Sequence, residues 1–330
     1  MEARPHGAVS EVTKMRDSKR IVLAVIGSLL VVSGAAAWWG VSAADSGARA
    51  YRPTTRYYTL EAVEVEWAIA PGLVYRAWTY NGTIPGPQIE AIAGDTVVVT
   101  LVNGLDTIAS LHVHGLGYAI SSDGSFESGA YAMPGENYTY TLTSDRRAIG
   151  TWMYHDHVAR SEAMDDALGE MDVGEEMFMN SIEGIEKGMY GAIVVRAPQE
   201  RRVDREYVLF MDEYLPEYTN ITPPEGMEMY AGFNGKTWPA NPTLFAYVGE
   251  TVRFRLISIG TESHTFHLHG HKWVDEASNR WVDTKQVGPF ETYTFTIVAG
   301  ENGPGEWLYH CHDLMHLMEG MEGMFVVEPR

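Results

Sequence analysis

The stretch Trp307-Leu-Tyr-His-Cys-His-Asp-Leu-Met-His316, followed by Met321, decides how this sequence is interpreted. It contains Cys311, the only cysteine of the chain, and three of the 12 histidines. The similar stretch Trp152-Met-Tyr-His-Asp-His157 lies 155 residues earlier, since 307 − 152 = 155. The match indicates that one structural unit occurs twice in this chain.

Further matching segments extend the repeat on both sides of these two stretches. Pro87–Val99 matches Pro242–Phe254, and His112-Val-His-Gly matches His267-Leu-His-Gly, again at an offset of 155. Gly188–Val195 matches Gly320–Val327 at an offset of 132, so the first copy carries 155 − 132 = 23 extra residues. Two copies indicate a duplicated domain, because a solenoid needs at least three repeats.

Both copies consist of short runs rich in β-branched residues, separated by Gly, Pro and Asn. The clearest strand candidates are Thr96–Val102, Ala192–Val195, Thr251–Ile257 and Tyr293–Ile297. The pattern predicts an all-β protein with two tandem Greek-key β-sandwiches after an N-terminal hydrophobic segment. The expected divisions are residues 1–50 for that segment, 51–199 for the first domain and 200–330 for the second.

The N-terminus has the features of a targeting segment. Four basic residues between positions 14 and 20 precede an uncharged run of 24 residues, Ile21–Ala44, and a membrane span needs roughly 20. The basic flank predicts a cytoplasmic N-terminus and export of the rest. Val41-Ser-Ala43 also resembles a cleavage site. We therefore expect an extracytoplasmic protein that is either membrane-anchored through this segment or secreted after cleavage.

Composition argues against a nucleic-acid-binding protein and against a disulfide-stabilised fold. The chain has 330 residues and a formal net charge of −20, which argues against nucleic acid as a partner. A single cysteine excludes internal disulfides.

The histidines indicate a metal protein, because 11 of the 12 fall into four short clusters. Cys311 and His316, with Met321 beyond, supply most of a blue-copper site, which uses two imidazoles, a thiolate and a weak axial thioether. His264 can supply the second imidazole. Eight histidines remain in His-X-His pairs, four from each half of the chain, and they are enough to hold several more coppers.

These clusters resemble the copper motifs of multicopper oxidases, and especially those of the two-domain small laccases, over about residues 55 to 330. Ser110–Gly124 and His264–Trp273 also match that family in detail. The resemblance implies two cupredoxin-like domains and four coppers per functional site. It assigns His264, Cys311, His316 and axial Met321 to a type 1 copper, and His112 and His267 to a type 2 copper. It assigns a type 3 pair to His114, His155, His157, His269, His310 and His312.

The same resemblance predicts roles for several other residues. Asp156 stands where the second copy has Cys311, so the first domain lacks the thiolate of a type 1 site. Tyr118 and Asp123 match positions near the trinuclear copper site, where Tyr118 can supply an electron and Asp123 can relay protons; on spacing alone they are equally a core tyrosine and a turn aspartate. His271 has no assigned copper, and we expect it to support a ligand.

The resemblance predicts a laccase-like oxidase that couples one-electron oxidation of a phenolic or aromatic reductant to reduction of dioxygen to water. The eight histidines divide four and four, so a first domain must face a second domain across each trinuclear site, either within one chain or between neighbouring chains. The resemblance to small laccases implies the second arrangement, in a homotrimer. The alternatives are a metal-ion oxidase for Cu(I), Fe(II) or Mn(II), a copper nitrite reductase, and a non-enzymatic blue-copper electron carrier. The methionines and carboxylates of residues 160–188 suit a metal substrate, although Met164, Leu168 and Met171 also fit the buried face of a small helix.

Overall fold

The computed structural model describes residues 51–158 and 182–330 of the chain, within the compact unit Ala50–Arg330. The hydrophobic N-terminal segment and the methionines considered in the insertion lie outside the described residues. Within the described ranges, no helix has both the length and the hydrophobicity that a membrane crossing requires.

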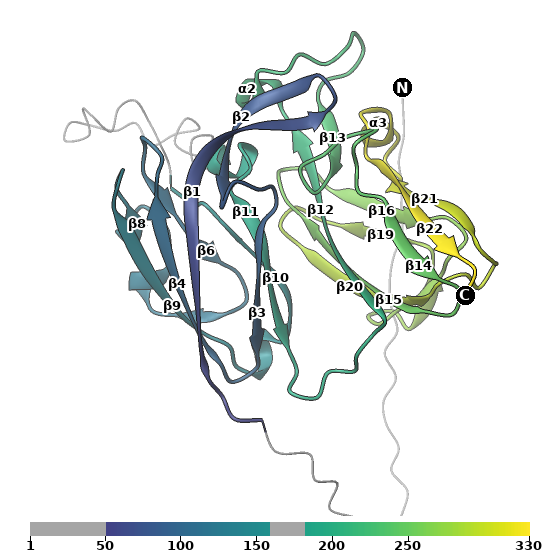
Figure 1. The fold of residues 1–330 in the computed structure, drawn as a ribbon, viewed down its shortest axis with the longest axis horizontal. Coiled ribbons are helices and arrows are strands. Elements are labelled where there is room, and N and C mark those ends of the chain that lie inside the picture. The colour runs from purple at the N-terminus through teal and green to yellow at the C-terminus, as the bar shows by residue number, and fades with distance from the viewer. Residues whose placement is uncertain (1–50, 159–181) are drawn as a thin grey trace, which may run out of the picture. The chain divides into compact units, whose positions relative to one another are not determined.

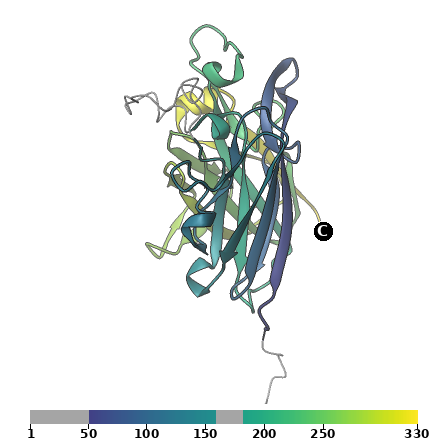
Figure 2. The same ribbon diagram turned by 90° about the vertical axis from the view of Figure 1, so that its left-hand side faces the viewer.

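Two sheets form the first half of the fold, with strand orders β2-β1-β4-β9-β7 and β3-β11-β10-β6. Their strands are β1 (Thr55–Ala70), β2 (Leu73–Tyr80), β3 (Gly86–Ile92), β4 (Thr96–Asn103), β6 (His112–Val113), β7 (Gly117–Tyr118), β9 (Asn137–Thr143), β10 (Gly150–His155) and β11 (Tyr190–Arg196). Further elements are the pair β5 (Ala109–Ser110) and β8 (Tyr131–Ala132), the 3-10 turns η1 (Ile120–Ser122) and η2 (Arg146–Ala148), and a helical stretch at residues 182–186. Figure 2 shows the first half turned toward the viewer, with the long purple strand β1 on the right.

The second half repeats this arrangement, with strand orders β13-β12-β15-β20 and β14-β22-β21-β16-β19. Its strands are β12 (Arg205–Tyr214), β13 (Tyr230–Phe233), β14 (Leu244–Tyr247), β15 (Thr251–Ser258), β16 (His264–Leu268), β19 (Thr284–Val287), β20 (Thr292–Val298), β21 (Gly305–Cys311) and β22 (Glu322–Glu328). The hairpin β17 (Trp273–Asp275) and β18 (Arg280–Val282) and the short helices α2 (Pro216–Thr219) and α3 (Leu314–Met318) complete it. Figure 1 shows the first half in purple to teal and the second in green to yellow.

The duplication is visible in the strand pairing. Each half contains two parallel strand pairs, β1 with β4 and β3 with β11 in the first half, and β12 with β15 and β14 with β22 in the second. The four strand candidates from the sequence correspond to β4, β11, β15 and β20. The all-β prediction of two tandem sandwiches is therefore confirmed.

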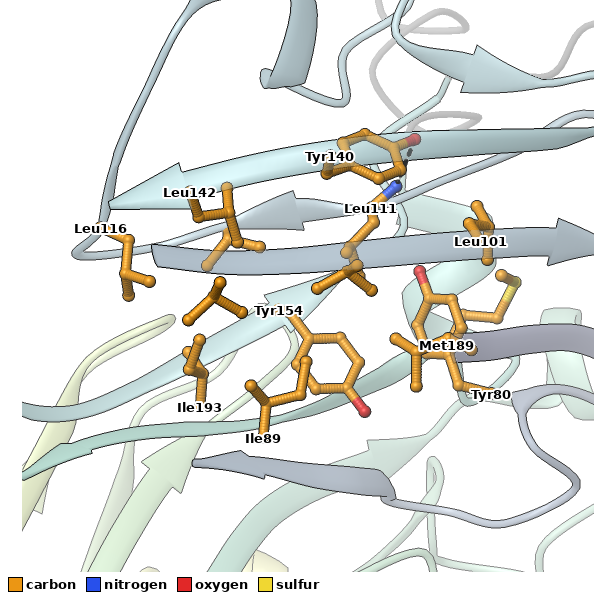
Figure 3. Packing of buried hydrophobic residues seen from close by; sticks show 14 of the residues in the cluster. Tyr80, Ile89, Leu101, Leu111, Leu116, Tyr140, Leu142, Tyr154, Met189 and Ile193 are labelled. Carbon is orange, nitrogen blue, oxygen red and sulfur yellow. Dashed lines mark hydrogen bonds between the residues drawn. The ribbon is translucent and has the colours of Figure 1, made fainter. Parts of the chain in front are cut away.

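Each sandwich encloses its own hydrophobic core, and a third cluster joins the two halves. Figure 3 shows the first core, where Tyr80 and Tyr154 meet edge to face with ring centroids 5.4 Å apart. The hydroxyl of Tyr140 accepts a hydrogen bond from the Leu111 N–H at 3.1 Å. Full burial of one such large side chain is worth roughly 1.5–3 kcal/mol. The strands that carry His112, His155, His264, His267 and His310 are therefore part of well-packed sheets.

A buried arginine fixes the two halves to each other. Arg255 on β15 donates from Nη1 to Thr151 Oγ1 on β10 at 2.7 Å, and its Nη2 lies 3.1 Å from carboxylate oxygens of both Glu200 and Glu206. Only 4% of the Arg255 side chain is exposed. Burial acts to raise the pKa of Glu206, but the hydrogen bonds from Arg196 and Arg255 outweigh it and hold that pKa at about 2. Glu206 is therefore ionised, and its ion pair with Arg255 helps to hold the two halves together.

We expect the substitution Arg255→Met to lower the free energy of unfolding by about 2 kcal/mol, because it removes a buried guanidinium from two partly buried carboxylates, Glu200 and Glu206. The measurement is urea unfolding. The matched control is Arg147→Met, which removes an exposed pair with Asp145 and should change nothing measurable. Equal stability of the two variants would show that Arg255 does not hold the two halves together.

Candidate metal centres

The first candidate centre consists of His264, Cys311 and His316, whose ligand atoms all lie within 4.8 Å of one another. His264 Nδ1 is 3.2 Å from His316 Nδ1, and Cys311 Sγ is 3.6 Å from the same atom. All three side chains are buried. Two imidazoles and a thiol around one point form the donor set of a type 1 copper site.

Local structure explains how these ligands meet. His264 begins β16 and Cys311 ends β21, and the two strands pair with Phe266 opposite Cys311. Asp313 caps α3 by accepting a hydrogen bond from the Met315 N–H at 2.9 Å, which places His316 on the buried side of that helix.

Met321, the expected axial ligand, is fully buried next to this centre. Its N–H donates to the His316 carbonyl at 2.9 Å, and its carbonyl accepts from the Cys311 N–H at 3.1 Å. The backbone of Met321 is therefore bonded to two of the expected ligands. Burial also raises the pKa of the Cys311 thiol, and a metal ion would bind it as the thiolate.

Two further groups of histidines occupy equivalent places in the two halves. In the first half, His112, His114 and His155 bring their ligand atoms within 4.8 Å of one another, and in the second half His267, His269 and His310 do the same. The rings of His157 and His312 lie 5.1 Å from His112 and 5.4 Å from His267, between centroids. The structure therefore gathers all eight expected type 2 and type 3 ligands into two half-sites.

The His-X-His spacing places both rings on one side of the chain. Side chains alternate between the faces of a strand, so Val113 and Leu268, between the paired histidines, point into the cores and are buried. The glycine that follows each pair is also required. Gly115 and Gly270 have positive φ angles of 75° and 67°, and a Cβ there would approach within 2.0 Å of Trp152 and 2.3 Å of Trp307.

Backbone carbonyls fix the orientation of four imidazoles. His112, His155, His267 and His310 each have Nδ1 between 2.5 and 2.8 Å from a carbonyl oxygen, respectively those of Asp123, Asp156, Asp283 and Cys311. A carbonyl only accepts, so Nδ1 carries the proton and Nε2 is free to bind a metal. Burial lowers the pKa of His114 to about 4 and holds that of His155 well below its usual value. The rings of His114 and His155 are therefore neutral, as ligands must be.

The two half-sites do not meet within one chain. Among residues 51–158 and 182–330, no shared ligand group and no ring contact joins a histidine of the first half-site to one of the second. Each half-site therefore holds four of the eight expected type 2 and type 3 ligands.

Asp156 shows why the first half has no counterpart of the type 1 centre. The Ser110 N–H donates to Asp156 Oδ1 at 2.8 Å, as the Thr265 N–H donates to Cys311 Sγ at 3.2 Å. The Asp156 N–H donates to the Met189 carbonyl at 3.1 Å, which repeats the bond between Cys311 and Met321. In the first half, a carboxylate thus takes the place of the thiolate. The position equivalent to His264 is 264 − 155 = 109, and it is occupied by Ala109, so the second ligand is missing as well.

Three other sequence candidates also lie beside the histidines. The Tyr118 ring centroid is 6.0 Å from that of His112, and Asp123 provides the carbonyl for the same ring. A hydrogen bond from Ser125 lowers the pKa of Asp123, and burial raises that of Tyr118. His271 is buried, with Nδ1 2.9 Å from the His269 carbonyl, while its Nε2 accepts from the Gly300 N–H. This geometry agrees with a supporting role for His271.

The sequence interpretation missed Glu213, a buried carboxylate that contacts His264 at 2.8 Å. A signal was present, because Asp212 and Glu213 interrupt the apolar run Val208–Met211 of β12. It also missed the exposed apolar side chains of α3 around His316, which are Leu314, Met315 and Met318.

Comparison with known proteins agrees with this geometry. Two family models described as multicopper oxidase match residues 62–177 and 210–330, so the chain belongs to the multicopper oxidase family. A probable nitrite reductase-hydroxylamine oxidoreductase fusion protein of Kuenenia stuttgartiensis is 34% identical over 277 residues, which are 78% of this chain and 30% of that protein. Laccase-1 of Cryptococcus neoformans var. neoformans is 27% identical over 78% of this chain and 44% of its own.

The chain thus spans less than half the length of these two relatives. Among solved structures, the multicopper oxidase mgLAC superposes with a TM-score of 0.68 and 26% identity, over 83% of this chain and 86% of the other. The family implies copper as the metal, and the nitrogen and sulfur donors of the three centres suit it.

Proposed function

We propose that this protein is a laccase-like oxidase that takes electrons from a phenolic or aromatic reductant at the type 1 centre and delivers them to dioxygen at a trinuclear centre, with four coppers per functional site. Bound copper supplies one-electron transfer and dioxygen chemistry. The observation that carries the proposal is the position of Cys311 between His310 and His312. Its backbone gives a short covalent path from the thiolate to two imidazoles of the second half-site.

The protein supplies geometry and access. The carbonyls that accept from Nδ1 orient four imidazoles before a metal binds. Asp123 and Tyr118 lie beside His112, which supports a proton relay through Asp123 and an electron reserve at Tyr118. Two half-sites argue against an electron carrier, which needs only one centre.

We infer that each trinuclear centre forms between two chains of a homotrimer. The support is the separation of the half-sites within one chain, because one half-site alone holds only half of the ligands. Contacts between unlike surfaces of neighbouring subunits can close into a ring. We also propose an extracytoplasmic location, anchored or secreted, on the strength of the basic flank and the apolar run before residue 45.

The surface near the type 1 centre supports an organic reductant. Leu314, Met315 and Met318 are 65%, 49% and 68% exposed on α3, around the buried His316. Exposed apolar side chains of this kind mark binding surfaces, and an aromatic ring would pack against them. Thioethers also suit Cu(I), so the same surface supports the metal-ion alternative.

Oxygen uptake with a phenol, Cu(I) and Fe(II) distinguishes these functions. We expect the phenol to give the fastest uptake. The double variant Met315→Leu, Met318→Leu should change that rate by less than about twofold, since leucine keeps a similar apolar volume.

Met133→Leu serves as the control, because Met133 is a similarly exposed methionine (48%) in the first half. A preference for Cu(I) that disappears in the α3 variant but not in the control would establish the metal-ion oxidase. Consumption of nitrite without oxygen uptake would establish the reductase.

A further inference from the structure

The type 1 centre has an acidic neighbour on the side of His264 that faces away from the other ligands. Glu213, near the end of β12, places Oε1 2.8 Å from His264 Nε2. The opposite ring nitrogen, Nδ1, faces His316 Nδ1 at 3.2 Å. The imidazole therefore lies between the copper ligands on one side and a carboxylate on the other.

Both side chains of this contact are buried, so water cannot replace either partner. The side chains of Glu213 and His264 are 1% and 0% exposed. Within the described part of the chain, neither Glu213 Oε1 nor His264 Nε2 forms a hydrogen bond, although the two atoms lie only 2.8 Å apart. A buried polar atom without a partner costs about 1–3 kcal/mol, so a small rotation of the imidazole that aligns Nε2–H with Oε1 would remove this cost for both atoms.

A glycine keeps the space for this carboxylate. Gly260, at the start of the loop that leads to His264, has a φ of 98°. A Cβ at that position would lie 2.3 Å from Glu213 Oε2. Any larger residue would displace the carboxylate, so the loop and β12 fit each other around Glu213.

We propose that Glu213 is the positioning residue of the type 1 centre: it accepts the His264 Nε2–H, turns Nδ1 toward the copper, and thereby sets the copper affinity and reduction potential of the site. This inference rests on the blue-copper assignment proposed above. Acceptors on the outer nitrogen of a ligating histidine fix its tautomer and raise its basicity. A more basic imidazole stabilises Cu(II) more than Cu(I), so the contact lowers the reduction potential.

The test compares Glu213→Leu, Glu213→Gln and the control Glu186→Leu in the full chain. Glu186 is another buried acid, but among the described residues its carboxylate forms no ion pair, whereas Glu213 contacts His264. Titration with Cu(I) and Cu(II) and a redox titration of the blue band supply the readouts. We expect E213L to lose about 10- to 100-fold in Cu(II) affinity and less in Cu(I) affinity. A tenfold difference between the two ions raises the potential by about 59 mV.

Glutamine offers an amide oxygen in the same place, so E213Q should recover most of the affinity, and E186L should match the wild type. Thermal unfolding of the metal-free variants checks that each one folds. If E213L behaves like E186L, or if E213Q is as defective as E213L, the positioning role of Glu213 is overturned. A wild-type protein that never turns blue with copper would instead overturn the proposed function.

Discussion

Replacement of Cys311 by serine should abolish the blue colour and reduce oxidase activity to background. Cys311 is the only thiol of the chain, and a serine hydroxyl cannot replace the soft thiolate that a type 1 copper requires. The same substitution should leave the other three coppers bound, because their expected ligands are the eight histidines of the two half-sites. Serine is close to cysteine in size, so the packing between β16 and β21 should survive.

Metal analysis and absorption spectra provide the measurement. The wild type should hold four coppers per functional site, and the variant three, with near-ultraviolet absorbance of the type 3 pair retained. Loss of all copper in the variant would contradict the division into separate centres. About two coppers per wild-type chain, without that absorbance, would favour the nitrite reductase alternative.

A mixture of two inactive variants should regain oxidase activity if the trinuclear centres lie between chains. The first variant carries His112→Ala and His155→Ala, and the second carries His267→Ala and His310→Ala. Each alone lacks half of every centre. After co-expression with random assembly, about a quarter of the sites would combine an intact first half with an intact second half, since a head-to-tail contact takes its two surfaces from different chains.

Oxygen uptake of the mixed oligomers, compared with each variant alone, gives the result. Mixed oligomers are isolated through different affinity tags on the two variants. If mixed oligomers form and remain inactive, each chain builds its own centre and the trimer proposal fails.

The sequence was sufficient to predict much of the fold because its signals are local. Alternating β-branched runs indicate strands without knowledge of their partners, and β4, β11, β15 and β20 appear where the sequence placed them. The offset of 155 residues predicted the duplication. The structure repeats it even in single bonds, since Tyr154 donates to Pro87 and Tyr309 to Pro242, both at 2.6 Å.

The expected ligand sets also come from the sequence, and the structure brings their members together. The His-X-His spacing places two rings on one face of a strand, and Cys311 lies between two such rings. Geometry of this kind spans a few residues, so it follows from the chain order alone.

The tertiary structure decided what depends on contacts between distant segments. Glu213 meets His264 across 264 − 213 = 51 residues because β12 and the loop at Gly260 pack together. The separation of the two half-sites and the exposure of Met315 and Met318 likewise follow from the packing of whole sheets. The sequence by itself determined which side chains can bind copper, since ligand chemistry is a property of residue type and local spacing. Only the folded chain decided that the described half-sites lie apart and that the Glu213 carboxylate lies next to His264, because folding brings together groups that the sequence keeps far apart.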